Sequence, residues 1–107
     1  MQYSVEVSDN FIKEAKRLIK KYRSLKHEID ELSVDLASNP TLGTPLGNDI
    51  YKIRISVKSK GRGKSGGARI MSLVKVVDSV VILFSIYNKG EKDSISDVEI
   101  KKLVEGL

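Results

Sequence analysis

The sequence contains no cysteine and no tryptophan, and it has only one histidine, His27, among its 107 residues. Without cysteine the chain can form no disulfide and offers no thiolate as a nucleophile or metal ligand. A single histidine cannot build a zinc site or a pair of histidine acid–base catalysts. We therefore expect no metal site and no cofactor, and we expect any catalysis to depend on other side chains.

Long apolar segments are also scarce. The longest one, Val76 to Ile86, is interrupted by Asp78 and Ser85, and it is far shorter than the roughly 20 apolar residues that span a bilayer. The N-terminal residues lack the charged start and apolar centre of a signal peptide. We expect a cytoplasmic protein with no membrane partner. Its length predicts one domain over residues 1–107, large enough for a single core.

Acidic residues are absent from one long stretch between Asp49 and Asp78, which carries eight of the 19 Lys and Arg residues. The rest of the chain carries eleven basic and fourteen acidic residues, so the net charge of +5 is a local excess. A segment of this length with only positive charges is typical of surfaces that bind nucleic-acid phosphates. The alternative is a basic surface that only aids solubility. The eight residues are Lys52, Arg54, Lys58, Lys60, Arg62, Lys64, Arg69 and Lys75.

The hydrophobic pattern of the first half predicts one strand and two helices. Residues 2–7 alternate apolar and polar side chains as a strand does. Residues 11–22 and 24–38 have apolar side chains at helical spacing, which predicts an amphipathic helical hairpin. Residues 41–48 are rich in glycine and proline and are typical of a connecting loop.

The second half predicts three strands and a helix. We expect strands over residues 50–57, 68–77 and 80–87, with a mobile glycine-rich loop at 58–67 and a final helix that begins at Ser96. The third strand is apolar on both faces and is expected inside the sheet, although periodicity alone also allows a short buried helix. The predicted fold is α+β, in the order β-α-α-β-β-β-α, with a mostly antiparallel sheet and helices packed on one face. The other face would be open for binding.

Three segments also carry a family resemblance. They are residues 51–55 (YKIRI), 61–70 (GRGKSGGARI) and 86–92 (IYNKGEK). Together with the order of elements, they resemble the RelE/ParE superfamily of bacterial type II toxins over residues 3–103, and most closely its RelE and HigB branch. The resemblance implies a toxin that enters the ribosomal decoding site and cleaves messenger RNA, with the ribosome, the messenger RNA and an inactivating cognate antitoxin as partners.

The basic residues suit cleavage of RNA without a metal. Attack of a 2′-hydroxyl on the adjacent phosphodiester needs a base, positive charge to stabilise the phosphorane, and a proton for the leaving 5′-oxygen. Arg54 and Arg69 carry planar, permanently charged groups that fit a phosphate, so we expect them to hold the scissile group. Other cations around Lys52 would favour its neutral form, which makes it a candidate base.

The resemblance further implies basic or aromatic residues just before the last helix. Lys89, Lys92 and Tyr87 fall there, and we place Lys89 among the catalytic candidates. Tyr87 is a candidate to stack on a base or donate a proton, or it packs at the sheet edge. The chain differs from the best-known RelE pattern, because Gly90 replaces an arginine after the lysine and Ser96 lies near the position of a tyrosine. The identities of the general acid and base therefore stay open.

The remaining candidates are expected to bind phosphates of the messenger or the ribosome. They are Lys58, Lys60, Arg62, Lys64, Lys75, Tyr87 and Lys92. The glycine-rich stretch at 61–67 lacks the Walker spacing and no helix is expected after it, so we do not expect a nucleotide site. Two alternative functions remain: a ParE-like inhibitor of DNA gyrase, and a non-catalytic RNA-binding module descended from a toxin.

Overall fold

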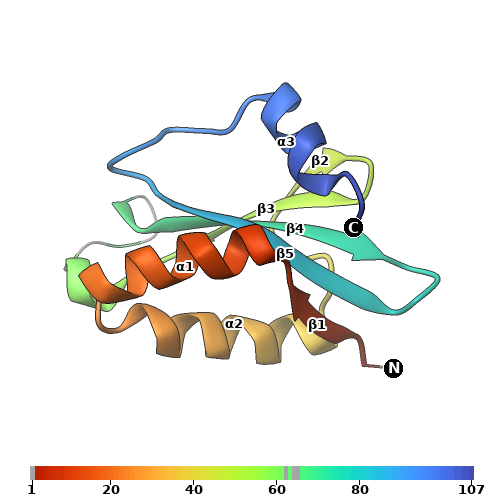
Figure 1. The fold of residues 1–107 in the computed structure, drawn as a ribbon. Coiled ribbons are helices and arrows are strands. Elements are labelled where there is room, and N and C mark those ends of the chain that lie inside the picture. The colour runs from red at the N-terminus through yellow and green to blue at the C-terminus, as the bar shows by residue number, and fades with distance from the viewer. Residues whose placement is uncertain (1, 62, 64–65) are drawn as a thin grey trace.

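The computed structural model describes residues 2–61, 63 and 66–107. Figure 1 shows a five-stranded sheet with helices on both faces. The strand order is β1-β5-β4-β3-β2; β1 and β5 are parallel and the other pairs are antiparallel. In chain order the elements are β1 (Ser4–Val7), α1 (Asp9–Lys21), α2 (Leu25–Ser38), β2 (Thr44–Gly47), β3 (Ile50–Ile55), the 3-10 helix η1 (Lys58–Lys60), β4 (Ala68–Lys75), β5 (Val80–Asn88) and α3 (Asp97–Val104).

The predicted helical hairpin is confirmed, and it covers one face of the sheet. The hydroxyl of Ser8 accepts a hydrogen bond from the backbone N–H of Phe11 at 3.1 Å and so caps α1. Phe11 and Leu18 of α1 and Leu36 of α2 are buried in the larger core cluster. In the same cluster lie the side chains of β3, β4 and β5 that point towards the hairpin.

The third helix lies on the opposite face, which corrects the expectation that all helices share one face. Because side chains alternate along a strand, β3 directs Ile53 towards the hairpin and Ile50 towards α3. Ile50, Met71, Phe84 and Tyr87 form a second buried cluster there, against which residues of α3 pack. The side of the sheet that was expected to be open is therefore partly covered by α3 (Figure 1).

The predicted loop at 41–48 contains a short additional strand, β2, at the edge of the sheet. Pro45 and the glycines of this segment hide it from sequence patterns, because such residues usually mark turns. The expected strand at 80–87 is confirmed as β5, which lies inside the sheet between β1 and β4. Among the residues described by the structure, no helix has the length and apolar character needed to cross a membrane.

Candidate RNA-cleavage site

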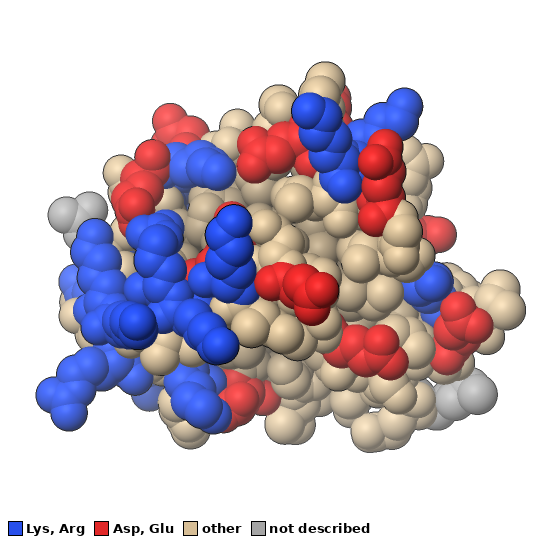
Figure 2. Space-filling model, in the orientation of Figure 1, with Lys and Arg blue, Asp and Glu red and all other residues tan. Residues whose placement is uncertain are grey.

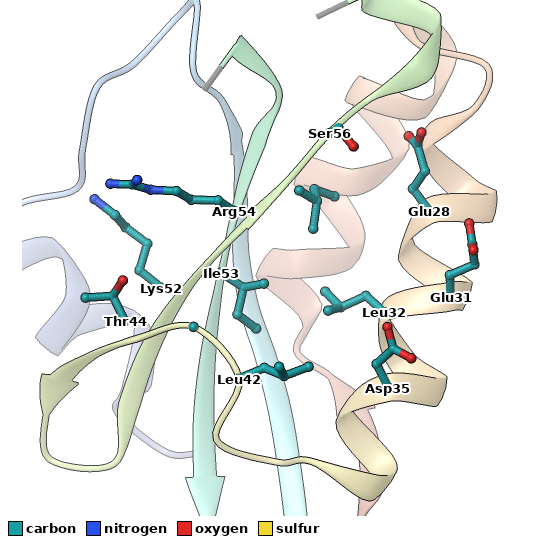
Figure 3. A pocket seen from close by; sticks show the side chains of 12 residues that line it. Glu28, Glu31, Leu32, Asp35, Leu42, Thr44, Lys52, Ile53, Arg54 and Ser56 are labelled. Carbon is teal, nitrogen blue, oxygen red and sulfur yellow. The ribbon is translucent and has the colours of Figure 1, made fainter. Parts of the chain in front are cut away.

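Four of the predicted site residues lie together on the sheet face that α3 partly covers. In the strand register Arg54 of β3 is opposite Arg69 of β4, and Arg69 is opposite Tyr87 of β5. Residues directly opposite each other have Cβ atoms about 4.5–5.5 Å apart. Lys52 is two residues before Arg54 and shares its face. In Figure 3 both side chains extend from β3 on the side away from α2.

The two arginines differ in depth. Arg54 is exposed, whereas Arg69 is only 3% exposed and its Nη1 atom donates a hydrogen bond to the Ala68 carbonyl at 3.3 Å. Burial, and next the repulsion by Arg54, lowers the pKa of the Arg69 guanidinium. The half-buried Lys52 and the exposed Arg54 therefore form the accessible part of the cluster, while Arg69 adds positive charge beneath them.

Tyr87 is an interior residue. Its ring packs in the second core cluster with Phe84 and Ile95, and the residue is 3% exposed. Burial raises the pKa of its hydroxyl, and the charges of Arg69 and Arg54 offset part of this effect. The hydroxyl has no hydrogen-bond partner among the residues that the structure describes. Stacking of Tyr87 on an RNA base would require the segment that covers it to move.

The loop between β3 and β4 is anchored at Lys60. The Lys60 ammonium donates hydrogen bonds to the side-chain oxygen of Asn88 and to the Gly67 carbonyl, and it lies 5.3 Å from the centre of the Tyr22 ring. Lys60 thus holds the loop in place, while Lys58 is exposed at its start. Arg62 and Lys64, which were predicted to bind RNA, lie outside the described residues.

A second anchor joins this loop to the turn between α1 and α2. The backbone N–H of Ser24 donates to the Ser59 hydroxyl at 2.7 Å, and the N–H of Ser59 donates to the Ser24 hydroxyl at 2.9 Å. The buried carboxylate of Glu28 accepts hydrogen bonds from the Lys58 N–H at 2.8 Å and from the Ser24 hydroxyl at 3.1 Å. Local sequence patterns do not reveal the contacts between the loop and this turn, because the partners are 30 and 35 positions apart.

Asn88 is a further residue that sequence reasoning missed. It is buried at the end of β5, and its side-chain amide donates to the Tyr22 hydroxyl at 2.8 Å and to Glu91 at 3.2 Å. Its oxygen accepts from Lys60 and from the N–H of Gly90. Asn88 therefore connects α1, the basic loop and the turn after β5. The hydrogen bond from Asn88 is the main reason that the pKa of Glu91 is lowered.

The remaining predicted residues take separate positions. Lys89 forms an ion pair with Asp93, and Lys92 lies 3.7 Å from Glu99 and 5.9 Å from the centre of the Tyr87 ring. Lys75 lies 3.9 Å from Asp78. Because Lys75 is at the opposite end of β4 from Arg69, about 20 Å along the strand, the structure does not bring it to the cluster.

The outward face of α1 forms another basic surface. Figure 2 shows Lys and Arg side chains gathered at the end of the molecule where α1 ends and η1 lies. The acidic Glu14 of this helix is turned inward and accepts a hydrogen bond from Ser85 at 2.9 Å, so it does not interrupt the positive surface. The exposed residues of α1 that contribute are Lys13, Lys16, Arg17, Lys20 and Lys21. The described part of the chain holds no group of three or more His, Cys, Asp or Glu residues suited to a metal ion.

Comparisons with known proteins agree with this architecture. Residues 8–105 match the family described as RelE toxin of the RelE/RelB toxin-antitoxin system. No curated protein matches the chain. A mutant of E. coli toxin RelE in which two arginines are replaced by alanine, in the free state, has a TM-score of 0.69 at 20% identity, over 97% of this chain and 100% of that one.

Two solved complexes are also similar. A chain of the intact E. coli RelBE toxin-antitoxin complex matches with a TM-score of 0.62 at 19% identity, over 80% of this chain and 95% of that chain. The same RelE mutant in complex with a RelBc antitoxin peptide has a TM-score of 0.64 at 17% identity, over 100% and 99% of the two chains. At such identities the structures establish the fold, whereas the family match spans most of the sequence. The chain therefore belongs to the RelE family of type II toxins.

Proposed function

We propose that this toxin is a metal-independent endoribonuclease that cleaves messenger RNA on the ribosome, and that a cognate antitoxin neutralises it. The observation that carries the proposal is the cluster of Lys52, Arg54 and Arg69 on one face of β3 and β4. Three cations gathered on a small area suit a phosphodiester, whose negative charge increases in the transition state.

The proposed mechanism uses the depth of each residue. The exposed Arg54 holds the non-bridging oxygens of the scissile phosphate, and the buried Arg69 adds positive charge behind it. Lys52 removes the proton from the 2′-hydroxyl as its oxygen forms a bond to phosphorus. The bond from phosphorus to the 5′-oxygen breaks, leaving a cyclic phosphate and a 5′-hydroxyl.

Lys89 is our candidate for the group that protonates the leaving 5′-oxygen. Lys89 follows directly after β5 and its side chain is 34% exposed, whereas the hydroxyl of Tyr87 is buried. We assign the exposed Lys58 and the basic face of α1 to phosphates of ribosomal RNA. A toxin that acts on the ribosome would work in the cytoplasm. The E. coli RelBE complex, which has the same fold, supports an antitoxin as the second partner.

Primer-extension mapping of cleavage during in vitro translation tests the proposal. Arg54→Ala should reduce cleavage by about 100-fold or more, since it removes a contact to the reacting phosphate. Lys75→Ala is the matched control, because it removes one positive charge from the far end of the sheet, and it should change cleavage only slightly. Equal cleavage by wild type and Arg54→Ala would refute the assignment. Inhibition of gyrase supercoiling without cleavage would favour the ParE-like function, and ribosome binding without cleavage would favour a non-catalytic module.

A further inference from the structure

An open groove lies between α2 and β3, and its lining on the β3 side includes Lys52 and Arg54 of the basic cluster. Its volume is about 470 Å³. Leu32, Leu42 and Ile53 line its apolar part, and Glu31 and Asp35 of α2 line its acidic rim. Figure 3 shows these side chains between α2 and β3, while Lys52 and Arg54 leave the strand on the other side. One short stretch of β3 thus separates an apolar groove with an acidic rim from a cationic surface.

The backbone of β3 is open along the same stretch. β2 pairs with β3 only from Ile50 to Lys52, and no other described strand flanks β3 on this side as it continues to Ile55. Two glycines reveal the direction of the carbonyls. A Cβ on Gly43 would lie 2.6 Å from the Lys52 oxygen, so this oxygen points outward, whereas a Cβ on Gly67 would lie 2.0 Å from the Ile55 oxygen, which points towards β4.

The backbone groups of consecutive strand residues alternate in direction. The N–H and C=O of Arg54 therefore point outward like those of Lys52, beyond the end of β2. Outward N–H and C=O groups on an edge strand are a template for another extended chain. Strand addition of this kind draws its affinity from main-chain hydrogen bonds and its specificity from alternate side chains.

We propose that this edge and groove receive an extended segment of the antitoxin, which adds to the sheet beside Arg54; the inference rests on the proposed function for the identity of the occupant. Alternate side chains of the antitoxin strand would enter the groove, where apolar ones contact Leu32 and Ile53 and a Lys or Arg pairs with the acidic rim. The side chains on the opposite face of the antitoxin strand would face Lys52 and Arg54, and Asp or Glu there would neutralise these two cations. The segment would then block the cluster directly.

The charges distinguish this occupant from RNA. Glu31 and Asp35 on the α2 side of the groove repel phosphates, whereas Lys52 and Arg54 line its β3 side. A peptide can present opposite charges on its two faces, as the two sides of β3 require, whereas a nucleic-acid backbone carries negative charge throughout. The antitoxin segment is therefore expected to alternate basic or apolar residues with acidic ones.

Titration calorimetry with full-length toxin and the purified protein encoded by the adjacent reading frame tests this surface. Asp35→Lys should weaken binding by 10-fold or more. Asp30→Lys is the matched control, because Asp30 is exposed on α2, pairs with Lys26 and does not line the groove. It should change the affinity less than threefold, and it corrects for the general effect of added positive charge. Both variants should cleave messenger RNA like wild type.

Hydrogen exchange of the wild-type complex gives a second test that needs no variant. Binding should protect the amide of Arg54, which lies on the open edge. Unchanged affinity in a folded Asp35→Lys protein, or an Arg54 amide that exchanges equally in the free and bound toxin, would overturn the groove assignment alone. Absence of any binding by wild type would overturn the antitoxin as partner as well, while cleavage activity would remain a separate measurement.

Discussion

Replacing Arg54 by glutamine is expected to make the protein more stable while it removes the cleavage activity. Arg54 lies directly opposite Arg69 in the register of β3 and β4. Arg69 is buried, and the repulsion by Arg54 contributes to the lowering of its pKa. Glutamine keeps much of the length of the side chain and removes the charge, so it relieves the repulsion with little loss of packing.

The size of the effect follows from the position of the pair. Cross-strand side-chain pairs contribute about 0.2–1 kcal/mol, and like charges directly opposite each other are destabilising. Water around the exposed Arg54 screens part of the repulsion. We therefore expect Arg54→Gln to raise the free energy of unfolding by about 0.5 kcal/mol, which corresponds to an increase of about 2–4 °C in Tm for a domain of this size.

Thermal and guanidinium unfolding followed by circular dichroism measure this change. Lys75→Gln is the control, since Lys75 has an attractive partner in Asp78 and its substitution should not stabilise the protein. The gain for Arg54→Gln should shrink as salt is added, because salt screens exposed charges. If Arg54→Gln is less stable than wild type by more than about 0.5 kcal/mol, the two arginines do not repel each other as the register implies.

Three further predictions concern single side chains. Tyr87→Phe removes a buried hydroxyl that has no partner among the described residues, so the free energy of unfolding should stay the same or rise by up to about 1 kcal/mol. Because burial raises the pKa of Tyr87 above its ordinary 10.0, wild type should lose stability as the pH rises past that value. Chemical unfolding at several pH values should show that the variant lacks this loss. Glu28→Ala leaves the Lys58 N–H and the Ser24 hydroxyl without their acceptor and should cost about 2–4 kcal/mol in urea unfolding, against less than about 0.5 kcal/mol for the exposed Glu31→Ala. Glu91→Gln should lack the part of the acid destabilisation that wild type shows in thermal melts as the pH falls below 4.5, because the lowered pKa of Glu91 means that its ionised form stabilises the fold; an identical acid profile would contradict this.

The face that carries the site could be predicted from local sequence. Ile53 and Ile55 alternate with Lys52 and Arg54, and this period of two fixes both the strand and the shared side of the two cations. The start of α3 was also predictable, since the Ser96 hydroxyl caps the helix by accepting from the Glu99 N–H. Both features depend on residues a few positions apart, where backbone geometry alone determines which side chains meet.

Other features depend on packing between distant residues. The sequence did not show which face α3 would cover, because its apolar side chains suit either side of the sheet. β5 contains an extra residue opposite the junction of Met71 and Ser72, which shifts the strand register near Phe84. Such a bulge changes the alternation of side chains and has no local signature in this strand. The anchoring roles of Glu28 and Asn88 were equally hidden, since their partners lie on other elements.

The parallel pairing of β1 with β5 has a consequence for synthesis of the chain. β1 is made first, but Ser4 pairs with Val80, so the strand stays without its partner until most of the chain has been translated. Contacts between such distant residues form late, because a long loop must close first. Lys52 and Arg54 likewise leave the ribosome before Arg69 and Tyr87 join them in the sheet. Because the cluster combines residues from position 52 to position 87, the complete cationic site forms only when synthesis of the toxin is nearly finished.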